Sequence, residues 1–154
     1  MGKVTAVCIS EKKGTQKTNV QTGHFIVDFG IKGDAHAGNW HRQVSLISQD
    51  KVDAFNQKGM EKLGIDQPLV GPGAFGENLI VEGIDFRNLP IGTRLHAGGV
   101  TLRMTQIGKE CHSHCAIYAQ VGDCIMPREG VFAVVETGGY ICVGDDMQVE
   151  LAAV

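Results

Sequence analysis

The sequence of 154 residues lacks several features that mark whole classes of protein. No stretch reaches about 18 uninterrupted apolar residues, so we expect no transmembrane helix and no membrane partner. The N-terminal apolar run is too short for a secretory signal peptide, and the cysteine count of five is odd, so we expect a reducing, cytoplasmic location. Lysine and arginine form no long run and the net charge is -3, which argues against a nucleic-acid partner.

Proline is scarce, at 4 residues, whereas glycine is frequent, at 21. The glycines are dispersed and bound short β-branched runs, which is typical of a β-rich fold with many turns and bulges. The chain shows no linker and no internal repeat, and its length suits one domain with a core that needs no disulfide or metal. We therefore expect a single, mainly β domain over residues 1–154.

Short runs rich in β-branched residues predict nine strands. They are Lys3–Ser10, His24–Phe29, His41–Ser48, Glu77–Glu82, Gly92–Ala97, Val100–Ile107, Val131–Glu136, Tyr140–Val143 and Asp146–Leu151. Because closing a sheet removes its exposed edges, the economical architecture is a closed or nearly closed β-barrel with one or two small helices.

The best helix candidate is Asp50–Leu63, which we expect to pack on the barrel. Its apolar residues Val52, Phe55, Met60 and Leu63 roughly follow a helical period. Ser48 could cap its start, and Gly64 could end it. A second helix could lie over the cysteine-rich segment described next.

The segment Gly108–Pro127 concentrates the reactive side chains of the chain. It holds Cys111, Cys115 and Cys124 together with His112 and His114. Gly108 follows an expected strand, and Lys109 and Arg128 are cations within reach along the sequence. Cations near a thiol lower its pKa and raise its thiolate fraction, which indicates a reactive site.

Three interpretations of this segment compete. A closed zinc site needs four ligands in a tetrahedron, usually as two separated pairs, and one short turn supplies them poorly. Cys111 and Cys115 could approach as a disulfide, but nothing indicates secretion. The third interpretation is a cysteine that acts as nucleophile, sulfur carrier or ligand to a soft metal. Cys8 and Cys142 lie in apolar runs and are expected to be ordinary core residues.

Cations beside glycine-rich loops are the candidates for binding an anion. Arg42 is the strongest of them, because it follows the loop Gly30–Trp40 at the mouth of an expected strand, and a guanidinium can hold phosphate with two hydrogen bonds. Lys17 could approach an anion, although its sequence context favours a solvated hairpin tip. The loop also carries Asp34 and His36, which could serve the site or only stabilise the loop.

Four stretches taken together resemble a known family. They are GDAHAG at Gly33–Gly38, HRQVSLIS at His41–Ser48, FGENLIVEGID at Phe75–Asp85, and the cysteine segment ending in GDCIMPREGVFA. Their order is similar to that of a standalone MOSC domain, the domain at the C-terminus of molybdenum cofactor sulfurases, in its small bacterial form. The resemblance runs from about Lys3 to Leu151 and implies a MOSC-type β-barrel.

The resemblance also implies a molybdenum cofactor (molybdopterin) and a cysteine that handles sulfur or contacts molybdenum. Cys115 matches the position of the family's cysteine best, with Cys111 as the competitor, and His112 and His114 could transfer protons. Residues expected to hold the cofactor are Arg42, His36, Lys17, Asn78, Lys109 and Arg128. Pyridoxal phosphate is associated with the family, but we do not expect this chain to bind it.

The implied function is cofactor binding or sulfur carriage in molybdenum cofactor biosynthesis, sulfuration or delivery. Expected partners are biosynthesis proteins of that cofactor or a cysteine desulfurase as sulfur donor. An alternative is a molybdenum-dependent oxidoreductase that reduces N-hydroxylated compounds with a separate electron donor, since the cysteines lack ferredoxin spacing. A third hypothesis is a metal-binding or thiol redox domain without a cofactor.

Overall fold

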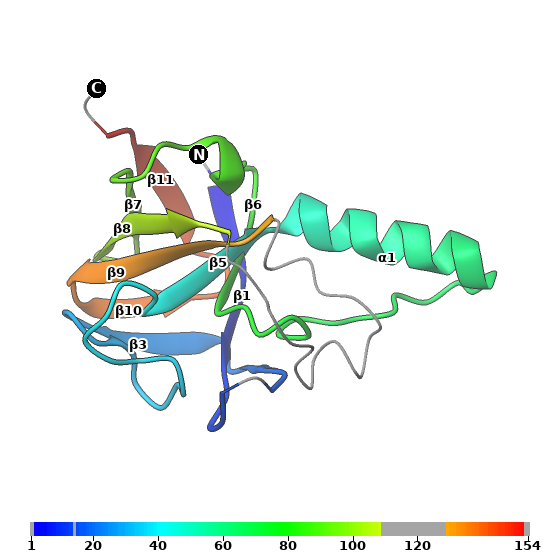
Figure 1. Ribbon diagram of the computed structural model, residues 1–154, viewed down its shortest axis with the longest axis horizontal. Coiled ribbons are helices and arrows are strands. Elements are labelled where there is room, and N and C mark those ends of the chain that lie inside the picture. The colour runs from blue at the N-terminus through cyan, green and yellow to red at the C-terminus, as the bar shows by residue number, and fades with distance from the viewer. Residues whose placement is uncertain (1, 14, 109–128, 153–154) are drawn as a thin grey trace.

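The structure, a computed structural model, describes residues 2–13, 15–108 and 129–152. In chain order its elements are β1 (Gly2–Ile9), β2 (Thr18–Asn19), β3 (Thr22–Ile26), β4 (Gly30–Ile31), β5 (Val44–Ser48), α1 (Gln49–Leu63), β6 (Leu79–Glu82), the 3-10 helix η1 (Phe86–Asn88), β7 (Arg94–Ala97), β8 (Val100–Ile107), β9 (Val131–Thr137), β10 (Gly139–Cys142) and β11 (Asp146–Glu150). The described residues are mainly β with one α-helix, as the sequence predicted (Figure 1). The second helix expected over the cysteine segment falls outside the described residues.

Seven strands close into a barrel. Their order is β11-β7-β8-β9-β5-β6-β1, and β1 pairs back to β11 through Gly2 with Met147 and Lys3 with Asp146. All pairs in this ring are antiparallel except β5 with β6, which is parallel. Because parallel neighbours cannot be joined by a tight turn, the chain must cross over between them, and α1 lies in that connection.

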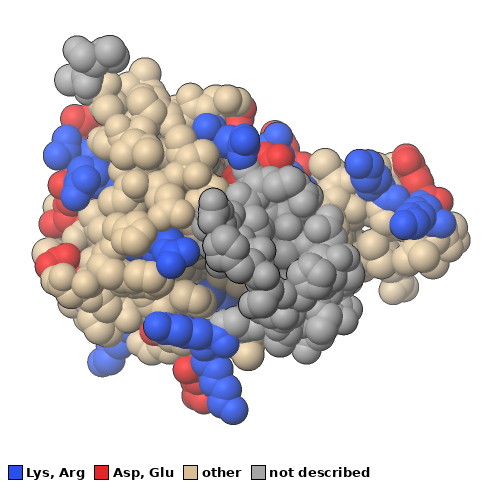
Figure 2. Space-filling view, in the orientation of Figure 1, with Lys and Arg blue, Asp and Glu red and all other residues tan. Residues whose placement is uncertain are grey.

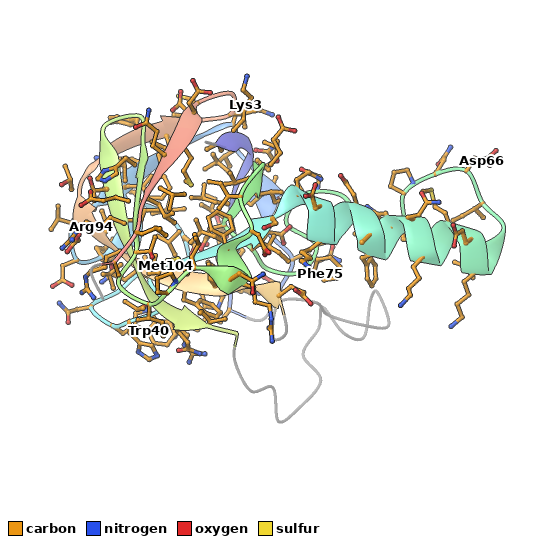
Figure 3. The ribbon with its side chains drawn as sticks, turned by 90° about the horizontal axis from the view of Figure 1, so that it is seen from above. Lys3, Trp40, Asp66, Phe75, Arg94 and Met104 are labelled. Atoms are coloured by element: carbon orange, nitrogen blue, oxygen red, sulfur yellow. The ribbon has the colours of Figure 1, made fainter. Side chains whose placement is uncertain are left out.

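Strand β8 shows how the barrel interior is filled. Val100, Leu102 and Met104 alternate with half-buried residues along the strand, so one face of the strand points inward. These three side chains belong to the main core cluster, which draws residues from nearly every barrel strand. Figure 3 shows Met104 within the barrel. The prediction of this strand, Val100–Ile107, is confirmed to the residue.

Strand β5 is buried on both faces and forms a wall between two apolar clusters. Val44 and Leu46 face the barrel core, whereas Ile47 belongs to a second apolar cluster on the outer side of the wall. Phe75 and Phe132 join this second cluster. The cluster connects the barrel to the base of α1, where Phe75 lies in Figure 3.

Helix α1 packs on the barrel only through its first turns, where Val52 joins the apolar cluster that contains Ile47 and Ile80. The helix projects outward, with Asp66 near its far tip (Figures 1 and 3). Of the four apolar residues that suggested a barrel-facing stripe, only Val52, in the first turn, is buried, and Leu63 is 59% exposed. The start and end of the helix were otherwise predicted closely, with Gly64 closing it in the left-handed conformation at φ 66°.

The partner of α1 is the segment that returns from its tip. The Asn56 side chain is buried and holds this segment with two hydrogen bonds, accepting from the Val70 N–H at 3.0 Å and donating to the Val70 carbonyl at 3.1 Å. At Gly59 an added Cβ would lie 1.8 Å from Leu69 Cδ1, so the absence of a side chain lets the segment approach. The helix and the returning segment therefore form an arm of their own.

A second sheet, in the order β10-β3-β4, flanks the barrel. Strand β3 ends at Ile26, earlier than the predicted Phe29, because Asp28 turns the chain at φ 56°. After Gly138 the chain leaves the barrel, and β10 pairs with β3 in register Tyr140 with His24. The short strands β2 and β4 and the 3-10 helix η1 were not predicted from the sequence.

Charged side chains are spread over the described surface. Figure 2 shows lysine and arginine interspersed with aspartate and glutamate over the barrel and the arm. Arg94 and Arg103 flank Glu136 on the barrel at 2.7 and 3.2 Å. The hydrogen bond from Arg94 and the two nearby positive charges lower the pKa of that carboxyl. Within the described part of the chain, no helix has the length and apolar character needed to cross a membrane.

The Asn56 contacts predict how the arm is stabilised. Asn56→Ala leaves the N–H and carbonyl of buried Val70 without their partners, which should lower the free energy of unfolding by about 1–3 kcal/mol. Chemical denaturation measures the change. The control is Gln57→Ala, because Gln57 follows Asn56 directly and is exposed. Its free energy of unfolding should stay within about 0.5 kcal/mol of the wild-type value. Equal effects in the two variants would contradict this role of Asn56.

Candidate functional site

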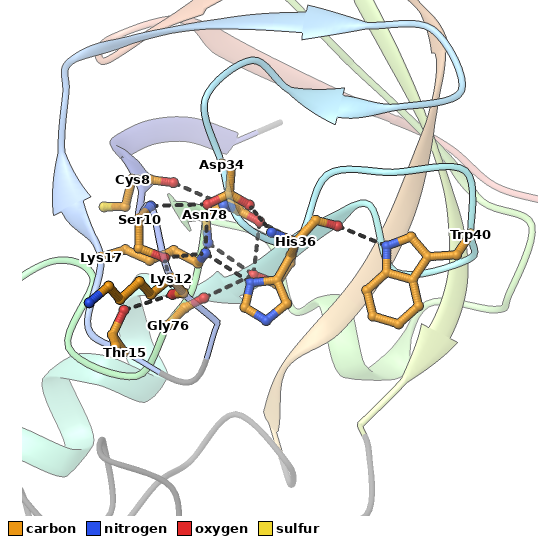
Figure 4. Close-up of polar contacts among 11 residues, drawn as sticks. Cys8, Ser10, Lys12, Thr15, Lys17, Asp34, His36, Trp40, Gly76 and Asn78 are labelled. Carbon is orange, nitrogen blue, oxygen red and sulfur yellow. Dashed lines mark hydrogen bonds and ion pairs between the residues drawn. The ribbon is translucent and has the colours of Figure 1, made fainter.

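Three segments meet at the end of β1 and build a polar cluster around Lys17 (Figure 4). The first runs from Ser10 at the end of β1 to Lys17. The second is the turn that carries Asp34 and His36, between β4 and β5. The third is the loop that ends at Asn78, just before β6. The GDAHAG and FGENL stretches, two of the four that suggested a family resemblance, therefore lie close together in space (Figure 4).

Lys17 is buried at the centre of this cluster, with only 4% of its surface exposed. Its Nζ lies 2.6 Å from Asp34 Oδ1, 3.1 Å from Ser10 Oγ and 3.0 Å from His36 Nδ1. The interpretation of Lys17 as a solvated hairpin tip is therefore wrong. No local pattern indicated its partners, because Ser10 is 7 residues away and Asp34 and His36 come from another segment.

The loop before β6 fixes the backbone of Lys17. The Lys17 N–H donates to the Gly73 carbonyl at 2.8 Å. A Cβ on Gly73 would lie 1.9 Å from the Lys17 carbonyl oxygen, and Gly73 has a φ of +87°. Only glycine meets both requirements, the close approach and the left-handed backbone. This contact connects the third segment to the charged centre.

Glu77 holds the same loop from inside. Its carboxylate is fully buried and accepts the N–H groups of Gly73 at 3.1 Å and Phe75 at 3.0 Å. Burial raises the pKa of Glu77 from 4.5 to about 7, although the backbone N–H donors and the charge of Lys17 act in the opposite direction. Glu77 therefore combines a structural role with a titration near neutral pH.

Asn78, expected as a cofactor residue, has a side chain that is fully buried. Its Oδ1 accepts the Ser45 N–H at 2.9 Å, and its Nδ2 donates to the Cys8 carbonyl at 2.9 Å. Ser45 Oγ lies 3.2 Å from the same Oδ1. These contacts join β1, β5 and the start of β6. The Asn78 side chain thus binds backbone groups of the protein itself.

Arg42 and His36 are the half-buried members of the expected cofactor set, and Trp40 lies between them. The Trp40 indole N–H donates to the His36 carbonyl at 2.8 Å. The Arg42 guanidinium carbon is 4.7 Å from the centre of the Trp40 ring and 5.7 Å from that of Phe132. Arg42 Nε is buried and finds no hydrogen-bond partner among the described residues.

Arg42 precedes β5 and is not part of it, which corrects the predicted strand His41–Ser48 to Val44–Ser48. The carbonyl of neighbouring His41 accepts a hydrogen bond from the Thr105 hydroxyl. Trp40 was missed as a site residue. Its position between the GDAHAG stretch and Arg42 was the only signal in the sequence.

The two cysteines that the structure describes are both unpaired. Cys8 is fully buried, as predicted, and burial followed by the charge of Glu77 raises its pKa to about 12. Cys142 is only half-buried, so its assignment to the core is wrong, and it accepts a hydrogen bond from the Thr22 hydroxyl at 3.3 Å. Burial therefore disfavours the thiolate of Cys8.

The other reactive residues predicted from the sequence lie outside the described residues. They are Cys111, Cys115, Cys124, His112, His114, Lys109 and Arg128. The ends of their segment are described: the Gly108 N–H donates to the Gly130 carbonyl at 2.7 Å, next to the pair of Ile107 with Val131. The described part of the chain contains no group of three or more His, Cys, Asp or Glu side chains suited to hold a metal ion.

The pKa of Glu77 predicts a pH dependence of stability. Between pH 4.5 and about 7 the folded protein keeps a proton that the unfolded chain has lost, so the free energy of unfolding should fall as pH rises through this window. The slope is at most about 1.4 kcal/mol per pH unit for one proton. Urea denaturation between pH 4.5 and 7 should show this fall in the free energy of unfolding in the wild-type protein and not in Glu77→Gln.

The variants are compared by the slope of the free energy of unfolding against pH. The absolute value is not used, because glutamine places an NH2 group near a backbone N–H and lowers stability at every pH. Glu82→Gln is the matched control, since Glu82 is exposed on β6, and it should keep the wild-type slope. A Glu77→Gln slope equal to that of wild type would show that Glu77 titrates alike in the folded and unfolded states.

Comparisons with known proteins agree with this architecture. The fold is similar to YuaD from Bacillus subtilis, with a TM-score of 0.76, 20% identity, and coverage of 99% of this chain and 98% of that one. It is similar to YiiM from Geobacillus stearothermophilus, with a TM-score of 0.70, 18% identity, and coverage of 97% and 75%. YiiM from Escherichia coli gives a TM-score of 0.65, 17% identity, and coverage of 99% and 70%.

A search of the curated proteins finds no match. The family model of the MOSC domain, in contrast, matches residues 33–148, which include the Asp34–His36 turn, Arg42, the Glu77–Asn78 pair and nearly all barrel strands after β4. This match covers well over half of the chain, and the barrel and the grouping of the motifs are in accord with it. The chain therefore belongs to the MOSC domain family, a family associated with the molybdenum cofactor.

Proposed function

We propose that this protein binds the molybdenum cofactor beside Arg42, Trp40 and His36, and that a cysteine of segment 109–128 carries sulfur or contacts the metal. The observation that carries the proposal is Arg42. Its guanidinium is held against two aromatic rings, and its buried Nε has no acceptor among the described residues. A charged donor without an acceptor in a half-buried position fits an oxyanion such as the cofactor's phosphate.

The aromatic rings position Arg42 through contacts that do not use its N–H donors. Stacking on Trp40 and Phe132 fixes the guanidinium while leaving its N–H groups to a ligand. His36 lies one contact away, since Trp40 bonds its carbonyl. Lys109 and Arg128 would add positive charge near the ligand. Among the described residues of the proposed site, Arg42 supplies a cation and a donor, which suits an anionic group.

Bound cofactor would supply a molybdenum centre whose soft-ligand preference suits a thiolate. Cys115 is our choice for that thiolate, with Cys111 as its assistant and His112 and His114 as proton carriers. In sulfur transfer, the Cys115 thiolate would attack the terminal sulfur of a donor persulfide. One S–S bond forms, the donor's S–S bond breaks, and the donor leaves as a thiolate. A cysteine desulfurase is a donor of this class, and proteins of cofactor biosynthesis would be the further partners.

Metal and pterin analysis of protein from a molybdenum-replete anaerobic host tests the proposal as a whole. We expect molybdenum and pterin to copurify with the protein. Zinc alone would contradict the proposal. If the protein also reduces an N-hydroxylated compound with a chemical reductant, the result would support the oxidoreductase function as well as cofactor binding.

The role of Arg42 leads to a prediction about affinity. Arg42→Ala should weaken cofactor binding by the loss of charge-assisted hydrogen bonds, worth about 1.5–3 kcal/mol. Equilibrium binding of the isolated cofactor measures this loss, and circular dichroism confirms that the barrel remains folded. Arg42→Lys keeps the charge but not the planar donor group, and should recover only part of the affinity.

Arg103→Ala is the control, because it removes an arginine on the barrel surface that is already paired with Glu136. It should leave affinity unchanged. If Arg42→Ala binds as tightly as Arg103→Ala, then Arg42 does not hold the phosphate.

The proposed thiol leads to a second prediction. A limiting alkylating reagent at neutral pH should label Cys115 first and leave Cys8 unlabelled, because burial keeps the Cys8 thiol protonated. Mass spectrometry locates the label. Persulfide loading or molybdenum retention should then be lost in Cys115→Ser and kept in Cys111→Ser. The reverse pattern would move the site to Cys111.

A further inference from the structure

The three contacts of the Lys17 ammonium determine where its protons lie. A lysine ammonium carries three N–H donors and no acceptor. Its Nζ has three polar neighbours at hydrogen-bond distance: Asp34 Oδ1, Ser10 Oγ and His36 Nδ1 (Figure 4). One proton is therefore available for each neighbour. Whether all three are donated depends on whether each neighbour accepts.

Ser10 must accept from Lys17. The Ser10 hydroxyl has a single proton, and its Oγ donates to the Lys12 carbonyl at 3.0 Å. A carbonyl oxygen can only accept, so that proton is used. The contact of 3.1 Å between Ser10 Oγ and Lys17 Nζ is then a hydrogen bond from the ammonium to the hydroxyl oxygen.

Asp34 must also accept. Its Oδ1 receives the Ser10 N–H at 3.1 Å as well as the Lys17 ammonium, and its Oδ2 receives the His36 N–H at 3.2 Å. Three donors on two oxygens are the environment of an ionised carboxylate. A carboxylate at 2.6 Å in turn holds Lys17 as the ammonium, so Lys17 cannot accept a hydrogen bond from anything.

The third neighbour, His36, then has one consistent state. Because Lys17 can only donate, Nδ1 must carry a lone pair, and the ring proton must be on Nε2. We propose that Lys17 is a positioning residue that holds His36 as the Nε2–H tautomer, so that a group facing Nε2 must accept a hydrogen bond. This assigns Lys17 an indirect role and distinguishes it from Arg42, whose Nε donor has no partner among the described residues.

The consequence for the ligand rests on the proposed function. With Nδ1 occupied by the ammonium, a ligand that contacts the imidazole meets the Nε2–H edge and must present an acceptor. An oxygen or nitrogen acceptor of an anionic cofactor satisfies this requirement, and a ligand that presents only donors does not. The state of His36 itself is a property of the protein without ligand, so it is tested independently of cofactor binding.

Long-range proton–nitrogen NMR correlation on protein labelled with 15N-histidine tests the proposal. His36→Gln assigns the His36 signals by their disappearance. In the wild-type protein without ligand at neutral pH, Nε2 should resonate as a protonated nitrogen and Nδ1 as an unprotonated, hydrogen-bonded one. A protonated Nδ1, alone or together with Nε2, would overturn the proposal.

Two variants test whether Lys17 is the cause. Lys17→Met removes the donor but leaves the buried Asp34 carboxylate unpaired, which endangers folding. Lys17→Met with Asp34→Asn removes both charges and preserves folding better. In the double variant the Nδ1 signal should shift away from its hydrogen-bonded position, and an Nδ1–H population should appear.

Lys12→Met is the matched control, because the Lys12 side chain is exposed and only its carbonyl takes part in the network. It should reproduce the wild-type His36 spectrum. A double variant whose His36 signals coincide with those of the control would show that Lys17 does not set the tautomer. If the wild-type protein shows the expected His36 tautomer but does not bind the cofactor, the result counts against the proposed function alone.

Discussion

The buried pair of Lys17 and Asp34 is the contact on which the arrangement of the site depends. Removing two charges from water costs several kcal/mol each, and their attraction offsets this cost only when further hydrogen bonds satisfy the remaining donors and acceptors. Here they do, because Ser10 and His36 complete both groups. The pair therefore requires two segments at once, and its geometry fixes the end of β1 relative to the turn before β5.

Around this pair the polar residues divide into two groups. Glu77 and Asn78 are fully buried, and their side chains bind backbone groups of the surrounding strands and loop. Arg42 and His36 are half-buried and stand at the outer side of the same network. The first group gives the second a rigid support, which is the condition for precise binding of an anionic ligand.

The sequence predicted those features that depend on local pattern. Alternation identified β8, and an apolar period with a final glycine identified α1. Burial of Lys17 could not be predicted, because its partners Ser10 and Asp34 are 7 and 17 residues away and the chain between them folds back. The outward direction of α1 could not be predicted either. Val52 and Phe55, at the start of its apolar stripe, pack in one cluster with Val70, whereas Leu63 is exposed. Periodicity alone does not say which surface covers a stripe.

The residues of the matched motifs differ in whether folding leaves their hydrogen-bonding groups available. The FGENL and QVSL stretches match the family motif order. Within them, Glu77, Asn78 and Ser45 form hydrogen bonds in which the partner is a backbone group of the protein itself. Such residues specify how the loops pack, so a structural likeness at 17–20% identity reports the fold alone. Chemistry must come from groups whose donors remain available after folding. Among the described residues, Arg42 Nε is the clearest such group, which is why the proposed site is built outward from it.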